Sequence, residues 1–299
     1  MRLLITGANG FIGSACVRMA QKRGHHVAGL KRPGRPVPPD LASSDQVVWL
    51  EGTLQAPPWQ AIEAFGPDAC LHAAWIATPG VYLDSPENDR LAAQSLDFLR
   101  NLVRRGTKWV VGVGTCIEYQ ITGCPLSEHH TPVAPTSPYA QAKDTLRRAL
   151  EQDAEQFGWH FAWGRVFYPY GPGEHPARFC TSLLEQLRRG QPVTIKSPHS
   201  LKDYIFIEDL AAAILLTLEQ RVTGPINWGT GRGVTIGQLA QTAADLFGRP
   251  ELIRFQDPPL PDPFHPVVAE VSRLRRLGWQ PQVSLREGLS RLWAALPPL

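Results

Sequence analysis

Short runs of apolar residues recur along the first 115 positions and alternate with stretches of helical spacing. The runs cover residues 3–5, 26–30, 47–50, 68–74 and 109–114. Brief, continuous apolar runs are typical of strands buried on both faces, and helices between them are typical of a parallel sheet. The pattern therefore predicts an α/β fold built around such a sheet.

The first run ends in three glycines, Gly7, Gly10 and Gly13, followed by a helix-forming stretch. Gly7 lets the chain reverse, Gly10 lets the backbone approach a pyrophosphate, and Gly13 lets the helix pack closely on the strand. The helix N-terminus directs free N–H groups and the positive end of its dipole at phosphates. We therefore expect a dinucleotide at this turn, bound by Gly7, Asn9, Gly10, Phe11, Ile12 and Gly13.

The strand, glycine turn and helix are closed by a second strand, which indicates a Rossmann-type unit. We expect an α/β fold: a doubly wound parallel sheet with a smaller mixed α/β C-terminal substrate lobe. The NAD(P)-binding domain is predicted at residues 1–165 plus 204–230, and the substrate-binding lobe at residues 166–203 plus 231–299.

The end of the second strand bears on the choice between NAD and NADP. An acidic residue at this position accepts the ribose hydroxyls of NAD and repels a 2′-phosphate. Here the chain has Lys31 and Arg32 instead. Cations favour a phosphate, so NADP is the predicted cofactor and NAD the alternative.

Composition excludes several classes of protein. The 299 residues are 43% apolar, and 30 basic against 27 acidic residues, dispersed along the chain, give no nucleic-acid footprint. Five scattered cysteines, Cys16, Cys70, Cys116, Cys124 and Cys180, indicate neither a disulfide framework nor a metal site. No apolar run approaches the ~20 residues of a membrane span. With a strand starting at Leu3 we also expect no signal peptide, and hence a cytoplasmic protein.

Tyr139 and Lys143 are four residues apart in a predicted helix and therefore share a face. Free tyrosine titrates near ~10, too high for easy proton exchange at neutral pH. A neighbouring lysine cation and an oxidised nicotinamide would lower that pKa, giving a usable acid/base, and the lysine would also hydrogen-bond the ribose. The spacing predicts a catalytic pair.

The glycine spacing with Thr6 and Phe11, followed by Tyr-x-x-x-Lys, resembles the extended short-chain dehydrogenase/reductase superfamily, in its nucleotide-sugar-modifying branch. Anchoring its Ser/Thr-x-x-x-Tyr segment on Tyr119 places Thr115 at the catalytic hydroxyl position, where it would stabilise a developing oxyanion. The resemblance further implies cofactor contacts by Thr53, Leu54, Ala73, Ala74, Trp75 and Phe167, with His72 a packed structural histidine, and substrate contacts by Cys116, Tyr168, His175, Arg178 and Lys202.

The family catalyses several reactions, and some are disfavoured here. Dehydratases of this branch usually follow the catalytic threonine with Asp-Glu, whereas this chain has Cys116 and Ile117. With NADP favoured, the primary expectation is an NADPH-dependent 4-ketoreductase acting on a nucleotide-linked deoxysugar through Thr115, Tyr139 and Lys143. The first alternative is an NAD-dependent nucleotide-sugar 4-epimerase, and a further one adds C3/C5 epimerisation through Cys116 and His175. From another class comes a non-enzymatic NADP-binding sensor.

The sequence leaves the identity of the substrate and the oligomeric state open. The nucleotide and sugar depend on residues 173–198 and 255–266, which carry little pattern. The resemblance also implies a homodimer formed through a helical stretch at residues 85–105.

Overall fold

The computed structural model describes residues 1–121, 123 and 125–298. It divides into two compact units. Unit 1 comprises Met1–Glu118, Val133–Arg165 and Ala211–Ile226. Unit 2 comprises Tyr119–Pro132, Val166–Leu210 and Asn227–Leu299, the last residue lying outside the described ones.

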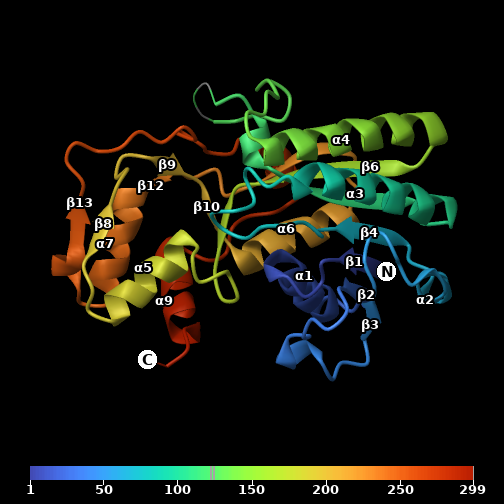
Figure 1. The fold of residues 1–299 in the computed structure, drawn as a ribbon, viewed down its shortest axis with the longest axis horizontal. Helices are drawn as coiled ribbons and strands as arrows, with labels where there is room; N and C mark the ends of the chain where they lie inside the picture. The colour runs from blue at the N-terminus through green and yellow to red at the C-terminus, as the bar shows by residue number, and fades with distance from the viewer. Residues whose placement is uncertain (122, 124, 299) are drawn as a thin grey trace. The chain divides into compact units, whose positions relative to one another are not determined.

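A seven-stranded parallel sheet, in the order β11-β6-β5-β4-β1-β2-β3, organises unit 1 (Figure 1). The expected fold class is confirmed. The strands are β1 (Arg2–Thr6), β2 (His26–Lys31), β3 (Val47–Glu51), β4 (Ala69–His72), β5 (Trp109–Thr115), β6 (His160–Val166) and β11 (Gly224–Trp228). The helices joining them are α1 (Phe11–Lys22), η1 (Pro39–Leu41), α2 (Trp59–Phe65), α3 (Glu87–Arg104), η2 (Cys116–Glu118), α4 (Pro138–Phe157) and α6 (Ile207–Glu219), which starts in unit 2.

The central strands of the sheet are buried on both faces, as the uninterrupted apolar runs require, whereas the edge strand β3 is partly exposed. In β5, for example, every residue from Trp109 to Thr115 is buried. Helices α3 and α4 lie side by side (Figure 1) and cover one face with α2. The core there joins Leu4, Ala28, Leu50, Cys70 and Val110 of the strands to Ile62, Phe98, Leu99, Leu146 and Leu150 of the helices.

Unit 2 contains three small two-stranded sheets, with parallel pairs β7–β10 and β8–β13 and an antiparallel pair β9–β12. Its strands are β7 (Tyr168–Tyr170), β8 (Val193–Ile195), β9 (Leu201–Lys202), β10 (Tyr204–Phe206), β12 (Val234–Thr235) and β13 (Ile253–Phe255). Its helices are α5 (Phe179–Arg188), α7 (Ile236–Leu246), η3 (Pro250–Leu252), α8 (Ser272–Arg276) and α9 (Leu285–Ala295).

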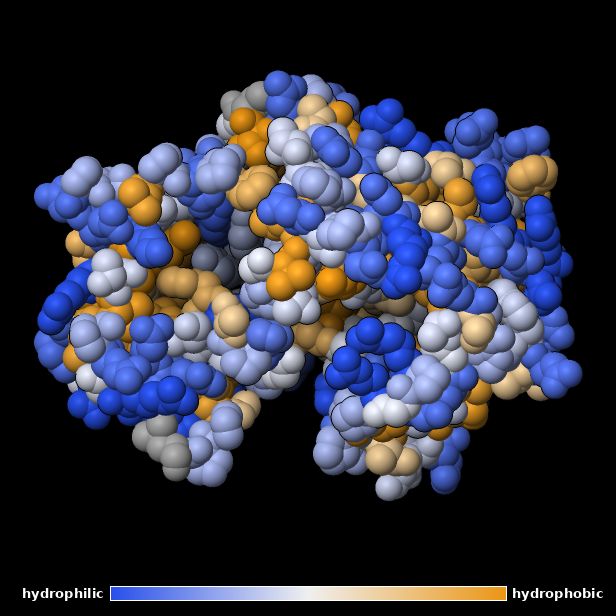
Figure 2. Space-filling model, viewed as in Figure 1, coloured by the Kyte–Doolittle hydropathy of each residue, from blue (hydrophilic) through white to orange (hydrophobic). Residues whose placement is uncertain are grey.

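The surface has no marked segregation of residue types on the face in view: Figure 2 shows hydrophobic residues interspersed with hydrophilic ones. Large exposed apolar side chains come from different elements, namely Val48, Val81, Phe157, Phe255 and Leu260. Among the helices that the structure describes, none is long and apolar enough to cross a membrane.

Candidate active site in unit 1

The glycine turn between β1 and α1 has no room for a side chain at Gly7 or Gly13. Gly7 has φ +65°, and a Cβ on it would lie 2.9 Å from Cα of Ala74. A Cβ on Gly13 would lie 2.1 Å from the Gly7 carbonyl oxygen. Helix α1 begins directly after Gly10, and no side chain among the described residues caps it. Its first-turn N–H groups are therefore offered to a ligand, and this cradle fits the phosphates of a dinucleotide.

A buried brace holds the end of β4 beside this turn. Thr6 Oγ1 accepts hydrogen bonds from the N–H groups of Ala73 and Ala74, both at 3.1 Å. Its single proton is therefore donated to His72 Nδ1 at 3.0 Å, so Nε2 carries the ring proton and donates to Ser95 Oγ at 2.9 Å. Burial, assisted by the charge of Lys143, lowers the pKa of His72 to about 3. His72 is a packed, neutral histidine, as expected.

Helix α4 brings Tyr139 and Lys143 one turn apart, because the helix begins at Pro138 and the Ser137 side chain caps it. Lys143 is 2% exposed; its Nζ donates to the Val113 carbonyl at 2.8 Å and lies 3.8 Å from the Trp75 ring centroid. Burial lowers the pKa of Lys143 to about 7, although the charge of Glu118 opposes this shift. The lysine is thus poised to change charge near neutral pH.

Aromatic rings surround Tyr139. The Tyr82 ring meets it edge-on at 4.9 Å between centroids, and the Trp75 ring does so at 6.4 Å. Trp75 is fixed by a hydrogen bond from Nε1 to Asn88 Oδ1 at 2.9 Å. These rings exclude water from one side of the Tyr139–Lys143 pair, which strengthens electrostatic effects there.

Thr115 ends β5, two residues beyond the carbonyl that binds Lys143. It is buried, and its backbone N–H donates to Glu118 Oε1 at 2.8 Å. The structure thus brings together three of the predicted catalytic elements within unit 1: the end of β5, Lys143 and Tyr139.

The sequence analysis missed Glu118, which is fully buried beneath this site. Its Oε2 accepts a hydrogen bond from Arg165 Nε at 2.8 Å and another from Trp163 Nε1 at 3.0 Å. Burial raises the pKa of Glu118, and the charge of Arg165 opposes the shift. An acidic residue within an otherwise apolar strand end was the available signal, since buried carboxylates need partners.

The end of β2 differs from the expectation that favoured NADP. Lys31 Nζ forms an ion pair with Glu51 Oε1, and Lys31 is 8% exposed while the Glu51 side chain is 57% exposed. The preference for NADP rests on two cations at this position, and Glu51 compensates the charge of one of them, Lys31. NADP therefore stays a prediction. Arg32, in the following loop, is exposed.

Some of the remaining cofactor candidates in unit 1 hydrogen-bond to the backbone of neighbouring loops. Asn9 Nδ2 donates to the Pro36 carbonyl at 3.2 Å, linking the glycine turn to the loop after β2. Thr53 Oγ1 accepts from the Ala56 N–H at 3.0 Å and closes a local turn. Phe11 and Ile12 start α1 and are half-buried, and Leu54 packs at the edge of the core.

The substrate candidates are divided between the units. Cys116 belongs to unit 1. Its side chain is buried, and so are those of Cys16, Cys70 and Cys180. Cys124 lies outside the described residues. Unit 2 holds the other substrate candidates, with Tyr168 in β7 and His175 and Arg178 just before α5. It also holds Phe167, a cofactor candidate, which is buried. His175 is exposed, and its Nδ1 accepts from the Ala177 N–H.

Lys202 in unit 2 is 3% exposed and is not a free cation. Its Nζ lies 2.8 Å from Asp262 Oδ2, donates to the Phe264 carbonyl and lies 4.9 Å from the Tyr168 ring centroid. Burial raises the pKa of Asp262, but the hydrogen bonds from Lys202, Ser200 and the Phe264 N–H together outweigh it, so that the pKa lies below its ordinary value. A phosphate would have to compete with this carboxylate for Lys202.

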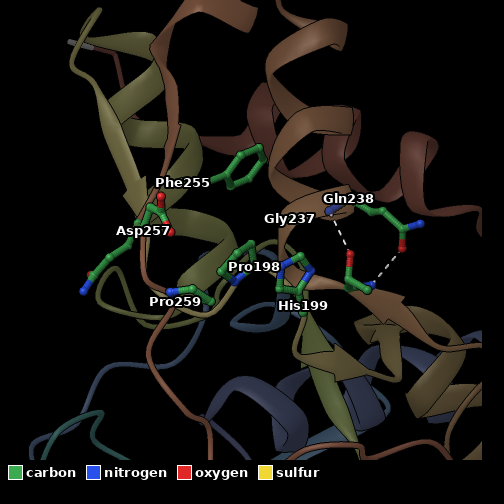
Figure 3. Close-up of a pocket in the computed structure, with 9 residues that line it drawn as sticks. Pro198, His199, Gly237, Gln238, Phe255, Asp257 and Pro259 are labelled. Atoms are coloured by element: carbon green, nitrogen blue, oxygen red, sulfur yellow. Dashed lines mark hydrogen bonds between the residues drawn. The ribbon is translucent and has the colours of Figure 1, made fainter.

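A hollow of about 420 Å³ lies within unit 2 (Figure 3). It is lined by Pro198, His199, Thr235, Gly237, Gln238, Phe255, Gln256, Asp257 and Pro259. The capping box of α7, in which Thr235 and Gln238 exchange hydrogen bonds, forms one wall. Residues from both weakly patterned segments of the sequence therefore meet at this hollow.

Comparisons with known proteins agree with this geometry. The NAD dependent epimerase/dehydratase family model matches residues 3–229. A UDP-glucose 4-epimerase of Mycolicibacterium smegmatis is 30% identical over 322 aligned positions, covering 97% of each chain. The structure of a UDP-glucose 4-epimerase from Thermotoga maritima with UDP-glucose is similar, with a TM-score of 0.84, 25% identity and coverage of 99% of this chain and 98% of that one.

A third relative is the UDP-glucose 4-epimerase of Thermus thermophilus, whose structure was solved in complex with NAD. Its TM-score is 0.82 at 26% identity, again over 99% of this chain and 98% of the other. The resemblance to extended short-chain dehydrogenases/reductases is confirmed, and the protein is an NAD(P)-dependent enzyme of that type. The chain belongs to the NAD dependent epimerase/dehydratase family.

Proposed function

We propose that this chain is an NAD-dependent nucleotide-sugar 4-epimerase. The observation that carries the proposal is the buried Lys143, which forms no ion pair with a described residue, one helical turn from Tyr139 and next to the β5 end that bears Thr115. Such a group is expected where a sugar hydroxyl must lose and regain a proton. The relatives named as UDP-glucose 4-epimerases, one of them in complex with NAD, favour this alternative over the 4-ketoreductase.

Each side chain has a distinct task in the proposed reaction. Tyr139 takes the proton of the C4 hydroxyl and returns it to the same oxygen after the configuration has changed. The Lys143 ammonium lowers the pKa of that phenol, and the Thr115 hydroxyl donates a hydrogen bond to the C4 oxygen. Bound NAD supplies a reversible two-electron acceptor. The Gly7–Gly13 turn and the Ala73–Ala74 backbone would hold it.

The units would divide the binding work. Unit 1 carries the glycine turn, and we propose it as the dinucleotide domain. Unit 2, with Tyr168, Arg178 and Lys202, would bind the nucleotide sugar. A homodimer through α3, the helix in the predicted segment 85–105, remains a prediction, resting on the resemblance alone.

Turnover without added cofactor tests the proposal. The purified protein is incubated with UDP-glucose, the substrate named for the relatives, and conversion to its C4 epimer is followed by chromatography. An epimerase regenerates its cofactor in every cycle, so conversion should proceed without added NADPH. Tyr139→Phe should lower the rate about 10²–10⁴-fold, the usual contribution of a general acid/base.

Reduction of a 4-keto sugar with stoichiometric NADPH consumption, and no epimerisation of any UDP, GDP, dTDP or CDP sugar, would instead establish the 4-ketoreductase. Full activity of Tyr139→Phe would contradict both mechanisms.

A further inference from the structure

The ion pair at the end of β2 and β3 concerns the choice of dinucleotide. In a parallel pair, residues in register project to the same face, and Lys31 is in register with Glu51. The sequence places them 20 positions apart, so the pairing becomes visible only once the strands are aligned. The two side chains therefore form one local unit at the carboxyl edge of the sheet.

This edge adjoins the glycine turn. The Ala8 N–H donates to the Leu30 carbonyl at 3.3 Å, and the Gly52 N–H donates to the Lys31 carbonyl at 3.0 Å. In Rossmann-type units the residue that ends the second strand faces the adenosine ribose of a dinucleotide held at that turn. A dinucleotide held at that turn would place its 2′ oxygen, the only point at which NAD and NADP differ, near Lys31 and Glu51.

The two charged side chains differ in their exposure to solvent. Lys31 is 8% exposed whereas the Glu51 side chain is 57% exposed, so the carboxylate is the more accessible of the two groups to a ligand that approaches from solvent. An approaching 2′-phosphate meets a like charge before it reaches the lysine, and like charges in close contact are strongly unfavourable. A 2′-hydroxyl can donate a hydrogen bond to the same carboxylate.

We propose that Glu51, at the end of β3, selects NAD over NADP in this chain, replacing the acidic residue that the end of β2 lacks. The proposal rests on the proposed function only in that the chain binds a dinucleotide; it holds equally for an epimerase and for a reductase. Lys31 then positions the carboxylate and is not itself a phosphate ligand.

Two other cations near this edge would favour NADP if they bound its 2′-phosphate. Arg32 and Arg35 are exposed in the loop after β2, where the Arg35 N–H donates to the Arg32 carbonyl. If either guanidinium group binds a 2′-phosphate, the chain prefers NADP despite Glu51, because arginine is well suited to phosphate. Affinities for both dinucleotides separate the two cases.

Isothermal titration calorimetry with NAD⁺ and NADP⁺ is performed on protein freed of cofactor, and mass spectrometry identifies the dinucleotide that co-purifies. We expect the wild type to bind NAD⁺ at least about tenfold more tightly. Glu51→Gln should gain NADP⁺ affinity by about tenfold, through release of Lys31, and the gain should shrink at high ionic strength.

The double variant Lys31→Met/Glu51→Gln should lose that gain. Glu63→Gln is the matched control: Glu63 is 50% exposed and pairs with Arg105 at 2.8 Å, on α2. It should leave both affinities unchanged. Circular dichroism and thermal melting check that each variant is folded.

An unchanged affinity ratio in Glu51→Gln would overturn the inference while leaving the proposed function standing. A wild-type preference for NADP⁺ would overturn the inference and the NAD dependence of the proposed epimerase, while leaving the proposed roles of Tyr139 and Lys143 standing. Clear NAD⁺ selection without any epimerase or reductase turnover would support the inference and refute the proposed function. Failure to bind either dinucleotide would overturn both.

Discussion

Two lysines are buried at the carboxyl edge of the sheet in unit 1, and they differ in what compensates their charge. Lys31 is paired with the carboxylate of Glu51. Lys143 has a carbonyl and an indole face, and no carboxylate of the described residues lies within ion-pair distance of it. A buried lysine that is paired with a carboxylate stays charged, because the carboxylate offsets the cost of desolvation. In a buried lysine without such a partner, desolvation lowers the pKa instead. Lys31 is therefore suited to holding the Glu51 carboxylate in place, and Lys143 to gaining and losing a proton.

The largest expected effect separates the two lysines by activity. Lys143→Met should lower turnover about 10²–10⁴-fold, because Tyr139 loses the cation that lowers its pKa. Lys31→Met should leave turnover at saturating NAD within about threefold, since its charge is already neutralised. Steady-state kinetics of both variants makes the comparison. Equal losses of turnover in the two variants would contradict the claim that the ion pair with Glu51 keeps Lys31 out of the chemical step.

The next effect concerns the ion pair beneath the site. Glu118→Gln leaves the Arg165 charge buried without its carboxylate, so the free energy of unfolding should fall by about 3–5 kcal/mol. Urea denaturation measures this loss. The double variant Glu118→Gln/Arg165→Met should be more stable than Glu118→Gln alone, because no buried charge remains. If the two losses simply add, the pair is not energetically coupled.

A smaller, pH-dependent effect is expected at His72. The pKa of His72 is lowered to about 3 from an ordinary value of 6.5, mainly by burial. Between these values the unfolded chain binds more protons than the folded one, so stability falls as the pH decreases from 6.5. His72→Gln should cost about 1–3 kcal/mol at pH 7, and its disadvantage should shrink on acidification. A disadvantage that is independent of pH would contradict the neutral, buried histidine.

The smallest expected effect is on the stability of the exposed pair. Glu51→Gln should lower the free energy of unfolding by about 1 kcal/mol: Lys31, which is 8% exposed, loses its partner, but the Glu51 side chain is 57% exposed and solvent screens the pair. The same variant is expected to change dinucleotide selectivity, so the pair would act on specificity alone. Thermal denaturation without cofactor measures the stability change, and a large loss would make Glu51 a structural residue.

Features set by local sequence could be predicted. The glycine turn follows from the steric needs of Gly7 and Gly13, and the Tyr139–Lys143 pair follows from helical periodicity. Apolar runs located five of the seven strands of the parallel sheet, β1 to β5, to within a few residues. Each of these depends on residues that are close in the chain, where spacing alone determines geometry.

Charge pairing could not be predicted in the same way, because it depends on which strands become neighbours. Lys31 was interpreted as a free cation, although Glu51 is its partner across β2 and β3. Lys202 and Asp262 are 60 positions apart, and Glu118 and Arg165 are 47. A pattern shows that a charge is buried but not which residue compensates it, so cofactor preference was the least secure of the functional predictions.

The most direct test of the contrast between the two lysines is a pH titration of Lys143. Protein labelled with ¹³C at the lysine ε-carbons is followed by NMR, with Lys143→Met assigning the resonance. We predict a midpoint near pH 7, because burial lowers the pKa of Lys143 to about 7. The free energy of unfolding relative to that variant should then rise with pH from about 7 toward the ordinary value of 10.5, since the unfolded chain binds more protons in this range. A midpoint near 10.5 would contradict the account.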